Sequence, residues 1–547
     1  MARTPDRTSV TSGPQDLAKE RTLSLRSPYP DVEIPDVSLT EFLFADGFGD
    51  RADAPAIVDG TTGDQLTYTE FHGLVEKIAG GLAARGIGTG DVVALFAPNL
   101  PQWAALFHGI LRANAIVTSA NSMYTGGELA HQLKDSGAKM VITVSPFLDR
   151  AVAGAKEAGL SSDVVLTIDA TEGHDSLRDL VSSGAPAPEL TTSADDTAVL
   201  PYSSGTTGLA KGVVLTHRNL VANLLQIQVM GDVTSETKIM AFLPFFHIYG
   251  MTVMMNQGLH ARATVVTMPK FDLEQFLTIT QDLQVDRLYI APPVAVALAK
   301  HPIIDKFDLS CVKTVFSGAA PLDGELGRAV AKRLDCTVLQ GYGMTELSPV
   351  SHCMPDDRGD LDLNSSGFAL PNIECKLVDP ESGQEVGVGE RGELWVKGPN
   401  VMVGYLNNSE ATDATKDADG FLHTGDIAVV DDEGVYSIVD RVKELIKYKG
   451  YQVPPAELEA LLLTHDKIAD TAVIGVKDAD GEEVPKAFVV KQASGEDLTE
   501  DDVMGFVAEK VAPHKKVRVV EFIDQIPKSA SGKILRKDLR ARENERA

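Results

Sequence analysis

The chain has 547 residues, too many for one hydrophobic core, so two or more domains are expected. Its 44% hydrophobic and 23% charged residues are ordinary for a globular protein in water. The net charge of −28 argues against nonspecific binding to nucleic acid or to an anionic membrane.

The N-terminal residues 1–22 are polar, contain Pro and Gly, and lack an apolar secretory core, so we expect a disordered tail there. The four cysteines contain no C-x-x-C pair, and neither a zinc site nor a redox motif is predicted. A reducing, cytoplasmic location fits this pattern. The most apolar stretch, 239–255, contains Pro244, His247 and Gly250, which favours a buried strand and an active-site wall over a membrane span.

From Ser38 to about residue 366, short apolar runs alternate with amphipathic helical patterns. Val92–Ala97 and Thr314–Phe316 are typical predicted strands, and Tyr68–Arg85 and Leu273–Leu283 are typical predicted helices. Such alternation predicts an α/β fold with parallel sheets covered by helices.

The pattern changes near residue 367. Strand patterns around the turn 431–434 predict an antiparallel subdomain at about 367–440, closing a large unit of 23–440. A third pattern, of mixed helices and strands, covers residues 441–547. This segment is long enough to form a domain and is predicted to be a small α+β domain. Almost all of the net negative charge lies before residue 441, so this last unit is relatively basic and suited to a polyanionic ligand; compositional drift is the alternative.

The segment Tyr202-Ser-Ser-Gly-Thr-Thr-Gly-Leu-Ala-Lys-Gly212 follows an apolar strand pattern. Glycines allow close backbone approach, while N–H groups, hydroxyls and a lysine can surround phosphate oxygens. It is not the usual G-x-x-x-x-G-K-[ST] loop. The order of its residues favours phosphate binding over a plain Gly/Ser surface loop. The predicted phosphate ligands are Ser203, Ser204, Gly205, Thr206, Thr207, Gly208 and Lys211.

This loop resembles the phosphate loop of the adenylate-forming superfamily, which includes acyl-CoA synthetases, beetle luciferases and peptide-synthetase adenylation domains. The resemblance covers nearly the whole chain, from about residue 25 to 540. Within the superfamily, the sequence most resembles the 4-coumarate–CoA ligases and their bacterial relatives. It departs from the family at Ala210, where proline is usual; we expect slower or weaker nucleotide handling at most. Further matching segments are Phe246-His-Ile-Tyr249, Ser317-Gly-Ala-Ala-Pro-Leu322, Gly341-Tyr-Gly-Met-Thr-Glu346, Lys443-Glu-Leu-Ile-Lys-Tyr-Lys-Gly-Tyr-Gln-Val453 and Pro527-Lys-Ser-Ala-Ser-Gly-Lys-Ile-Leu-Arg536.

The resemblance implies a large N-terminal domain with two helix-flanked, mostly parallel sheets and a small distorted β-barrel subdomain. It also implies a small mobile C-terminal domain, 441–547, that rotates about Lys443. ATP, Mg²⁺ and coenzyme A are the implied cofactors. Lys533, His247 and Thr345 are the implied catalytic residues, and Glu346 is the implied Mg²⁺ ligand.

The same resemblance assigns contact residues. Tyr342 would stack on adenine, and Thr345 would touch the α-phosphate. Asp426 would bond the ribose hydroxyls, and Arg441 would be a second ribose or phosphate contact. Further nucleotide and CoA contacts are expected at Gly318, Ala319, Ala320, Gln340, Gly341, Lys443, Lys447, Lys449, Gly450 and Gln452. The expected acyl pocket contains His247, Tyr249, Gly250, Val253, Ser317, Gly318, Gly341, Gly343, Pro349 and Val350.

The expected activity is ATP-dependent carboxylate–CoA ligation through an acyl-adenylate, with a hydroxycinnamic acid as substrate. A medium-chain fatty acyl-CoA ligase and an adenylating enzyme with another acceptor remain alternatives within the enzyme class. A degenerate nucleotide-binding regulatory protein is the alternative outside it. The partners are small molecules, with no nucleic acid and no membrane span, and the protein is expected to be a monomer or homodimer.

Overall fold

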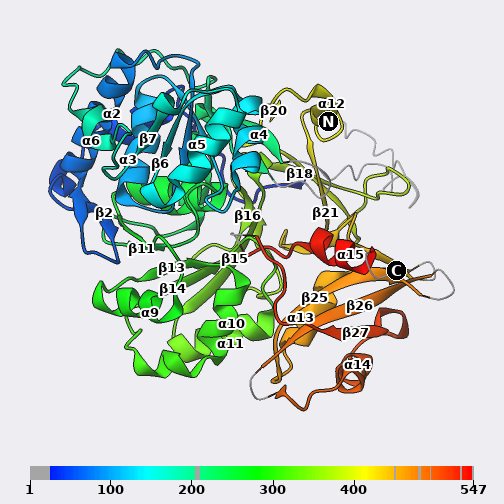
Figure 1. Cartoon of the computed structure of the whole chain (residues 1–547). Coiled ribbons are helices and arrows are strands. Elements are labelled where there is room, and N and C mark those ends of the chain that lie inside the picture. The colour runs from blue at the N-terminus through cyan, green and yellow to red at the C-terminus, as the bar shows by residue number, and fades with distance from the viewer. Residues whose placement is uncertain are drawn as a thin grey trace, which may run out of the picture.

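The computed structural model describes residues 25–203, 210–448, 451–478, 482–492, 495–529 and 532–544. The tail predicted for residues 1–22 lies outside these ranges. Within them the chain forms two large helix-covered sheets, an antiparallel sheet and a C-terminal α+β unit (Figure 1). The predicted α/β class with two mostly parallel sheets is confirmed.

The first sheet takes its central strands from the N-terminal third of the chain. Its strand order is β20 (Gly404–Tyr405), β10 (Lys211–Thr216), β8 (Thr197–Val199), β5 (Ile116–Ser119), β4 (Val92–Phe96), β6 (Ala138–Thr143) and β7 (Val165–Thr167), with β9 (Tyr202–Ser203) paired to β10. Strand β4 is buried at every position because its side chains alternate between two cores. Val93 and Leu95 belong to one core, and Val92, Ala94 and Phe96 to the other.

The second sheet carries most of the predicted site segments. Its order is β17 (Phe368–Ala369), β16 (Val350–Cys353), β15 (Thr337–Gly343), β14 (Thr314–Ser317), β13 (Arg287–Ile290), β11 (Lys238–Ala241), β12 (Thr264–Thr267), β2 (Pro55–Asp59) and β3 (Gln65–Thr67). Strands β15, β14, β13 and β11 pair in parallel. Their carboxyl ends therefore meet at one edge, where ligands of such sheets bind.

Helices lie against the faces of both large sheets (Figure 1). In the N-terminal part these are α1 (Leu39–Phe44), α2 (Tyr68–Ala84), α3 (Pro101–Arg112), α4 (Gly126–Ser136), α5 (Leu148–Glu157), α6 (Leu177–Val181) and α7 (His217–Met230). Next come the π-helix η4 (Tyr249–Asn256), α8 (Gln257–His260), α9 (Leu273–Asp282), α10 (Pro292–Lys300), α11 (Gly324–Leu334) and α12 (Ser409–Asp413). Short 3₁₀ turns occur at η1 (Gly49–Arg51), η2 (Ser145–Phe147), η3 (Ser162–Val164), η5 (Pro302–Lys306), η6 (Thr345–Leu347) and η8 (Pro513–Lys515).

The subdomain that the resemblance describes as a distorted β-barrel is built on an antiparallel sheet. Its order is β1 (Leu25–Arg26), β18 (Glu374–Val378), β19 (Gly392–Lys397), β21 (Leu422–Val430) and β22 (Tyr436–Arg441). Among the described strands the pairing does not close on itself, so β1 and β22 are edges of an open sheet. The predicted hairpin around 431–434 is present, and β1 adds a strand from the other end of the chain that local sequence patterns did not reveal.

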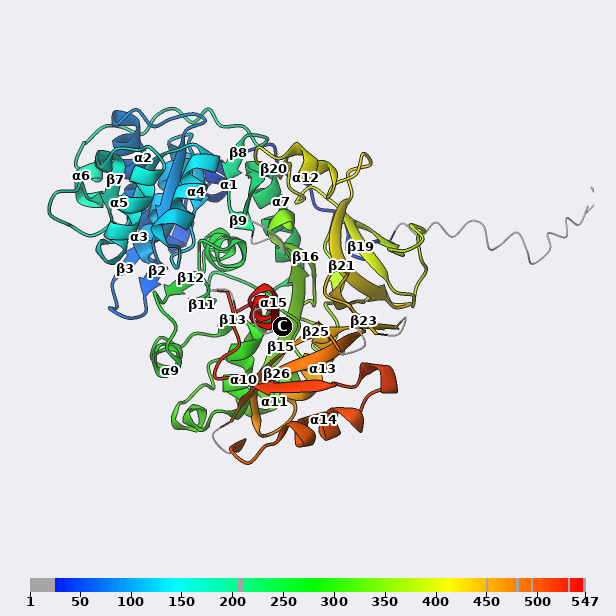
Figure 2. The same ribbon diagram turned by 45° about the vertical axis from the view of Figure 1, so that its right-hand side comes forward.

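The C-terminal unit contains the hairpin β23 (Ile446–Tyr448) and β24 (Tyr451–Val453), and a sheet of β25 (Ile468–Lys477), β26 (Glu483–Lys491) and β27 (Val519–Phe522). Its helices are α13 (Pro455–Leu463), α14 (Glu500–Ala508) and α15 (Arg536–Asn544). The buried residues of this unit form clusters separate from those of the large unit. In Figure 1 and Figure 2 the segment before α15 runs from this unit toward β13 and β15.

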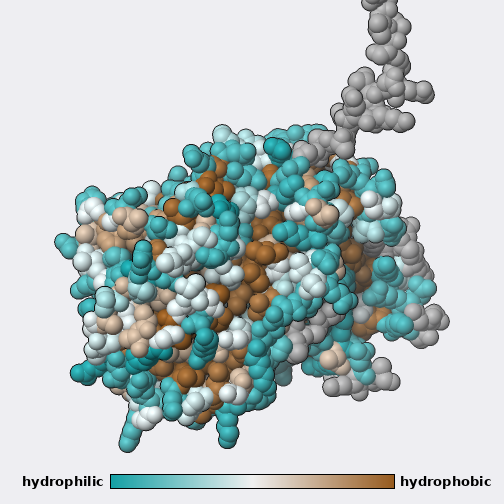
Figure 3. Space-filling model, turned by 90° about the horizontal axis from the view of Figure 1, so that it is seen from above, coloured by the Kyte–Doolittle hydropathy of each residue, from teal (hydrophilic) through white to brown (hydrophobic). Residues whose placement is uncertain are grey.

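Hydrophobic residues cross the middle of the upper face and are bordered by hydrophilic ones (Figure 3). The exposed large apolar side chains of the described residues are those of Met123, Val229, Phe271, Val403 and Val519. None of the described helices is both long and apolar enough to cross a membrane.

Candidate active site

The base of the predicted phosphate loop is a short antiparallel ladder. Lys211 lies opposite Ser203 and Gly212 opposite Tyr202, so β9 and β10 fix both ends of the loop. The Lys211 ammonium lies 4.8 Å from the centre of the Tyr405 ring. The predicted ligands Ser204, Gly205, Thr206, Thr207 and Gly208 lie outside the described residues.

Helix α4 supports this loop from one side. The Tyr202 hydroxyl donates to the Asp135 carboxylate at 2.7 Å, and the ring of His131 lies 3.4 Å from the carbonyl oxygen of Ala210. Both residues belong to α4, which begins with a capping box at Thr125. Ala210, which stands where the family usually has proline, therefore lies beside His131 of α4 as well as directly before Lys211.

Glu346 joins the phosphate loop to the second sheet. It lies in η6, directly after β15, and is 5% exposed. One carboxylate oxygen accepts hydrogen bonds from the Ser203 hydroxyl at 3.0 Å and the Tyr405 hydroxyl at 2.9 Å. Among the described residues no group of three metal-binding side chains occurs. A single carboxylate beside a phosphate loop fits Mg²⁺, which is usually held by one or two carboxylates together with substrate phosphates.

Two predicted ribose contacts come together through the antiparallel sheet. Asp426 in β21 and Arg441 in β22 are register partners, with 3.1 Å between the Arg441 Nε and an Asp426 oxygen. The Tyr342 hydroxyl donates to the other Asp426 oxygen at 2.6 Å. Burial, with the Asp426 charge, raises the pKa of Tyr342 well above its ordinary value. Tyr342 is therefore a neutral phenol whose ring is held beside the Asp426–Arg441 pair.

Lys533 reaches this cluster from the C-terminal unit. Its pKa is lowered to about 8, chiefly by burial and next by the charge of Arg441, while Asp426 and Glu346 act in the opposite direction. Burial and, to a smaller extent, the Lys533 charge lower the pKa of His247 to about 4. The Lys533 ammonium thus feels the charges of both halves of the predicted nucleotide site, and His247 is neutral at physiological pH.

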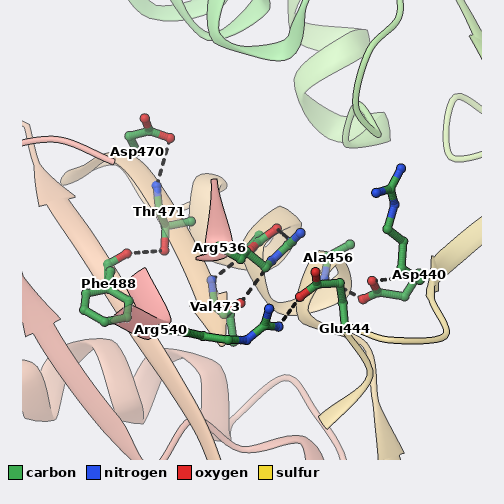
Figure 4. A network of polar contacts seen from close by, with 11 residues as sticks. Asp440, Glu444, Ala456, Asp470, Thr471, Val473, Phe488, Arg536 and Arg540 are labelled. Carbon is green, nitrogen blue, oxygen red and sulfur yellow. Dashed lines mark hydrogen bonds and ion pairs between the residues drawn. The ribbon is translucent and has the colours of Figure 1, made fainter. Parts of the chain in front are cut away.

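The loop that carries Lys533 is held by one contact within it and by others directly after it. Within the loop, the Lys533 amide donates to the Ser529 hydroxyl at 3.1 Å. After it, Arg536 donates to Glu459 of α13 at 2.6 Å and to the Val473 carbonyl at 3.2 Å (Figure 4). These contacts fix the loop to the core of the C-terminal unit.

Helix α15, which begins at Arg536, also holds the connection between the two units. Arg540 of α15 pairs with Glu444, which lies three residues after Arg441 (Figure 4). Asp440 accepts the Ala456 amide of α13 at 3.0 Å, and burial raises its pKa to about 6. The segment predicted to contain the hinge is therefore tied to α13 and α15.

The predicted hinge and CoA-channel residues are less completely described. Lys443 and Lys447 are exposed, and the Lys447 amide donates to Glu483 at 2.8 Å. Lys449 and Gly450 lie outside the described residues, and of Gln452 only the backbone, opposite Lys447 in the β23–β24 hairpin, is described. In the described part of the chain no hydrogen bond or ion pair joins Lys443 or Lys447 to the Lys533 cluster.

The predicted acyl-pocket residues gather around η4 and the ends of β14 and β15. A side chain at Gly250 would meet the Pro244 carbonyl oxygen at 2.3 Å, and one at Gly318 would meet the Tyr249 ring at 2.9 Å. Only glycine allows these two approaches. The Ser317 hydroxyl is buried and has no hydrogen-bond partner among the described residues. Val253 and Val350 line one small cavity at the end of this region.

The remaining predicted residues shape the loops at this edge. Gln340 accepts the Leu322 amide and donates to the Leu322 carbonyl, both at 2.9 Å. Its amide thus holds the loop containing Gly318, Ala319 and Ala320, and a direct ligand contact stays a prediction. The backbone of Gly343 packs on the Pro349 carbonyl, and Gly341 packs beside the Phe316 ring. Thr345 begins η6 and is half-buried.

Several residues at the site were not predicted. Tyr405 contacts both Lys211 and Glu346, and its position on β20, an edge strand paired with β10, explains this. It belongs to no motif, so only the tertiary pairing reveals it. Other unpredicted residues line the cavity beyond Val253 and Val350: Gln257, Arg287, Tyr289, Phe316 and Asp356.

Comparison with known proteins adds independent information. Residues 44–406 match the family of AMP-binding enzymes, and residues 457–533 match the AMP-binding enzyme C-terminal domain. The chain is 42% identical over 537 residues to 4-coumarate--CoA ligase 1 of Petroselinum crispum, covering 96% of this chain and 98% of that protein.

Solved structures are similar over nearly the whole chain. The ATP-bound MatB of Rhodopseudomonas palustris superposes with a TM-score of 0.83 at 31% identity, over 93% of this chain and 99% of that one. The anthranilate CoA ligase AuaEII, in complex with anthranoyl-AMP, superposes with a TM-score of 0.86 at 25% identity, over 94% and 98% of the two chains.

Proposed function

This chain belongs to the AMP-binding enzyme family, and from that premise we propose that it is an AMP-forming acid–CoA ligase whose substrate is a hydroxycinnamic acid such as 4-coumaric acid. It binds ATP, coenzyme A and the acid as substrates, with Mg²⁺. The observation that carries the proposal is that the charges of Glu346, Asp426 and Arg441 all act on the buried Lys533 ammonium, which comes from the C-terminal unit, and that Asp426 and Arg441 form an ion pair.

In the first half-reaction a carboxylate oxygen of the acid attacks the α-phosphorus of ATP, and the bond to pyrophosphate breaks. Lys211 and the loop after Ser203 hold the leaving phosphates, and Mg²⁺ at Glu346 would supply further neutralising charge. Lys533 stabilises negative charge at the reacting oxygens. No side-chain nucleophile is required, since positioning and charge stabilisation account for most of the catalysis in such transfers.

In the second half-reaction the CoA thiolate attacks the acyl carbonyl carbon, and AMP leaves. We propose that residues 441–547 rotate about Lys443 between the two steps, which withdraws Lys533 and brings the CoA-binding residues to the adenylate. The exposure of Lys443, in a turn between β22 and β23, supports this role. Lys447, Lys449, Gly450 and Gln452 then line the approach of CoA, and exclusion of water protects the reactive adenylate.

We also propose that the protein works in the cytoplasm and that it is a monomer or a homodimer. The four cysteines are unpaired, which supports a reducing compartment. The separate cores on either side of residue 440 support domains of 23–440 and 441–547.

Incubation with ATP, Mg²⁺, CoA and, in turn, 4-coumaric, cinnamic, benzoic and octanoic acid tests the function. We expect AMP, pyrophosphate and an acyl-CoA thioester, with the highest kcat/KM for 4-coumaric acid. If only octanoic acid were turned over, the aryl-acid proposal would be wrong and the enzyme would be a medium-chain fatty acyl-CoA ligase. ATP binding without AMP release from any acid would refute the enzymatic function.

A further inference from the structure

A small cavity lies at the end of the predicted acyl pocket. Its volume is about 30 Å³, which is close to the space of one molecule in liquid water. Val253 and Val350, two residues of the predicted acyl wall, line it together with Phe316. It therefore lies where the far end of an acyl group would arrive, and it has room for a single small group.

Another part of the cavity lining is polar and deeply buried. Arg287 and Asp356 form a two-point ion pair, with N···O distances of 2.6 and 2.9 Å and side-chain exposures of 7% and 12%. The remaining guanidinium edge, Arg287 Nε–H, donates to the Tyr289 hydroxyl at 2.9 Å. That hydroxyl donates in turn to the Gln257 side-chain oxygen at 3.1 Å. We call these four residues the end wall.

The end wall has one donor and one acceptor left over. The Tyr289 oxygen accepts one hydrogen bond and donates one, which leaves a lone pair. The Gln257 amide nitrogen has no partner within the described segments, although this residue is only 4% exposed. A hydroxyl group can satisfy both, by donating to Tyr289 and accepting from Gln257.

The charge of the end wall narrows the choice of ligand. Asp356 neutralises Arg287, so a second carboxylate on the acid would enter a buried site with no unpaired cation. An alkyl end would leave the Gln257 donor without a partner, which is costly in a buried site. Burial, as the largest cause, raises the pKa of Tyr289, so its phenol is neutral. A neutral hydroxyl is the group that fits.

We propose that Tyr289 and Gln257 are specificity-determining residues that bind the distal hydroxyl of an aryl acid, and that the Arg287–Asp356 pair positions Tyr289. The inference rests on the proposed function and extends it, because it names the residues that distinguish 4-coumaric acid from cinnamic acid. Only the terminal hydroxyl enters the cavity, and the ring lies on the adenylate side.

The test compares kcat/KM for 4-coumaric and cinnamic acid in the full-length enzyme and in Tyr289→Phe. We expect the unmodified enzyme to prefer 4-coumaric acid by about tenfold or more, since a site built for a hydroxyl rejects the analogue that lacks it. In Tyr289→Phe this ratio should fall by about tenfold, with little change for cinnamic acid or in the KM for ATP.

Two further variants complete the design. Tyr68→Phe is the matched control, because the Tyr68 hydroxyl is also buried and donates to the Ala263 carbonyl at 2.7 Å but does not line the cavity; its ratio should not change. Gln257→Met removes the free donor and should lower the ratio even if Tyr289→Phe fails to fold, as judged by thermal melting.

The outcomes separate the two proposals. An unchanged ratio in folded Tyr289→Phe or Gln257→Met would overturn the role of the end wall and leave the ligase function intact. Equal use of cinnamic and 4-coumaric acid by the unmodified enzyme would do the same. AMP release from none of the acids would overturn the proposed function and this inference together.

Discussion

Raising the pH above 8 should slow formation of the acyl-adenylate, because Lys533 loses its charge. Its pKa of about 8 lies well below the ordinary lysine value, chiefly because of burial. The charged form is therefore present below pH 8 and is lost as the pH rises through this value. For an essential protonated group in the free enzyme, kcat/KM for ATP should then fall about tenfold for each further pH unit.

Bound ATP should raise the pKa of Lys533. The phosphates bring negative charge close to Lys533 and favour its protonated form, so kcat should begin to fall at a higher pH than kcat/KM. The assay is pyrophosphate release in the absence of CoA, which isolates the first half-reaction. Lys533→Ala should lower that rate by roughly 10²–10³-fold, the range typical for loss of one stabilising donor. It should leave thioester formation from supplied acyl-adenylate largely intact.

Lys533→Arg provides the decisive comparison. Arginine stays protonated, so this variant should lose activity through altered geometry but show no decline near pH 8. Lys139→Arg, at an exposed lysine paired with Asp91, is the control and should keep the original profile. A decline near pH 8 that persists in Lys533→Arg, or equal loss of both half-reactions in Lys533→Ala, would refute the assignment.

Three other predictions concern the hinge, the phosphate loop and the end wall. Lys443→Pro should retain adenylate formation and lose most thioester formation, since proline fixes φ at the hinge; rapid-quench measurement of both steps checks this, and normal acyl-CoA production would argue against rotation. Ala210→Pro should change ATP turnover without changing the order of preferred acids, and an altered acid preference would mean that the loop is misplaced. Asp356→Ala should lower the unfolding free energy by about 3–5 kcal/mol in urea titration, because Arg287 remains buried and unpaired. Asp360→Ala, which removes the exposed carboxylate that pairs with Arg358, is the control and should have no measurable effect. Similar losses of unfolding free energy in both variants would contradict the reasoning.

Contiguous motifs were readable from the sequence. The alternation of apolar runs and helical patterns predicted parallel sheets covered by helices, because a strand that is buried on both faces has an uninterrupted apolar sequence. The resemblance, and not the alternation, implied that there are two such sheets. The order of residues in 202–212, 340–346 and 527–536 predicted the segments that meet at the site, and the structure brings Lys211, Glu346 and Lys533 to that region. The antiparallel sheet of the β-barrel subdomain also contains β1, which joins it from a distant part of the chain.

The contacts between segments were decided by the tertiary structure alone. Asp426 and Arg441 carried weak signals separately, and strand register made them a pair. Tyr405 reaches Glu346 through an edge strand that has no motif. The end wall, with Tyr289 and Gln257 held by a buried ion pair, combines residues from several elements. A local pattern records whether a residue is buried in its own helix or strand, whereas strand register and helix packing determine which distant side chain it meets.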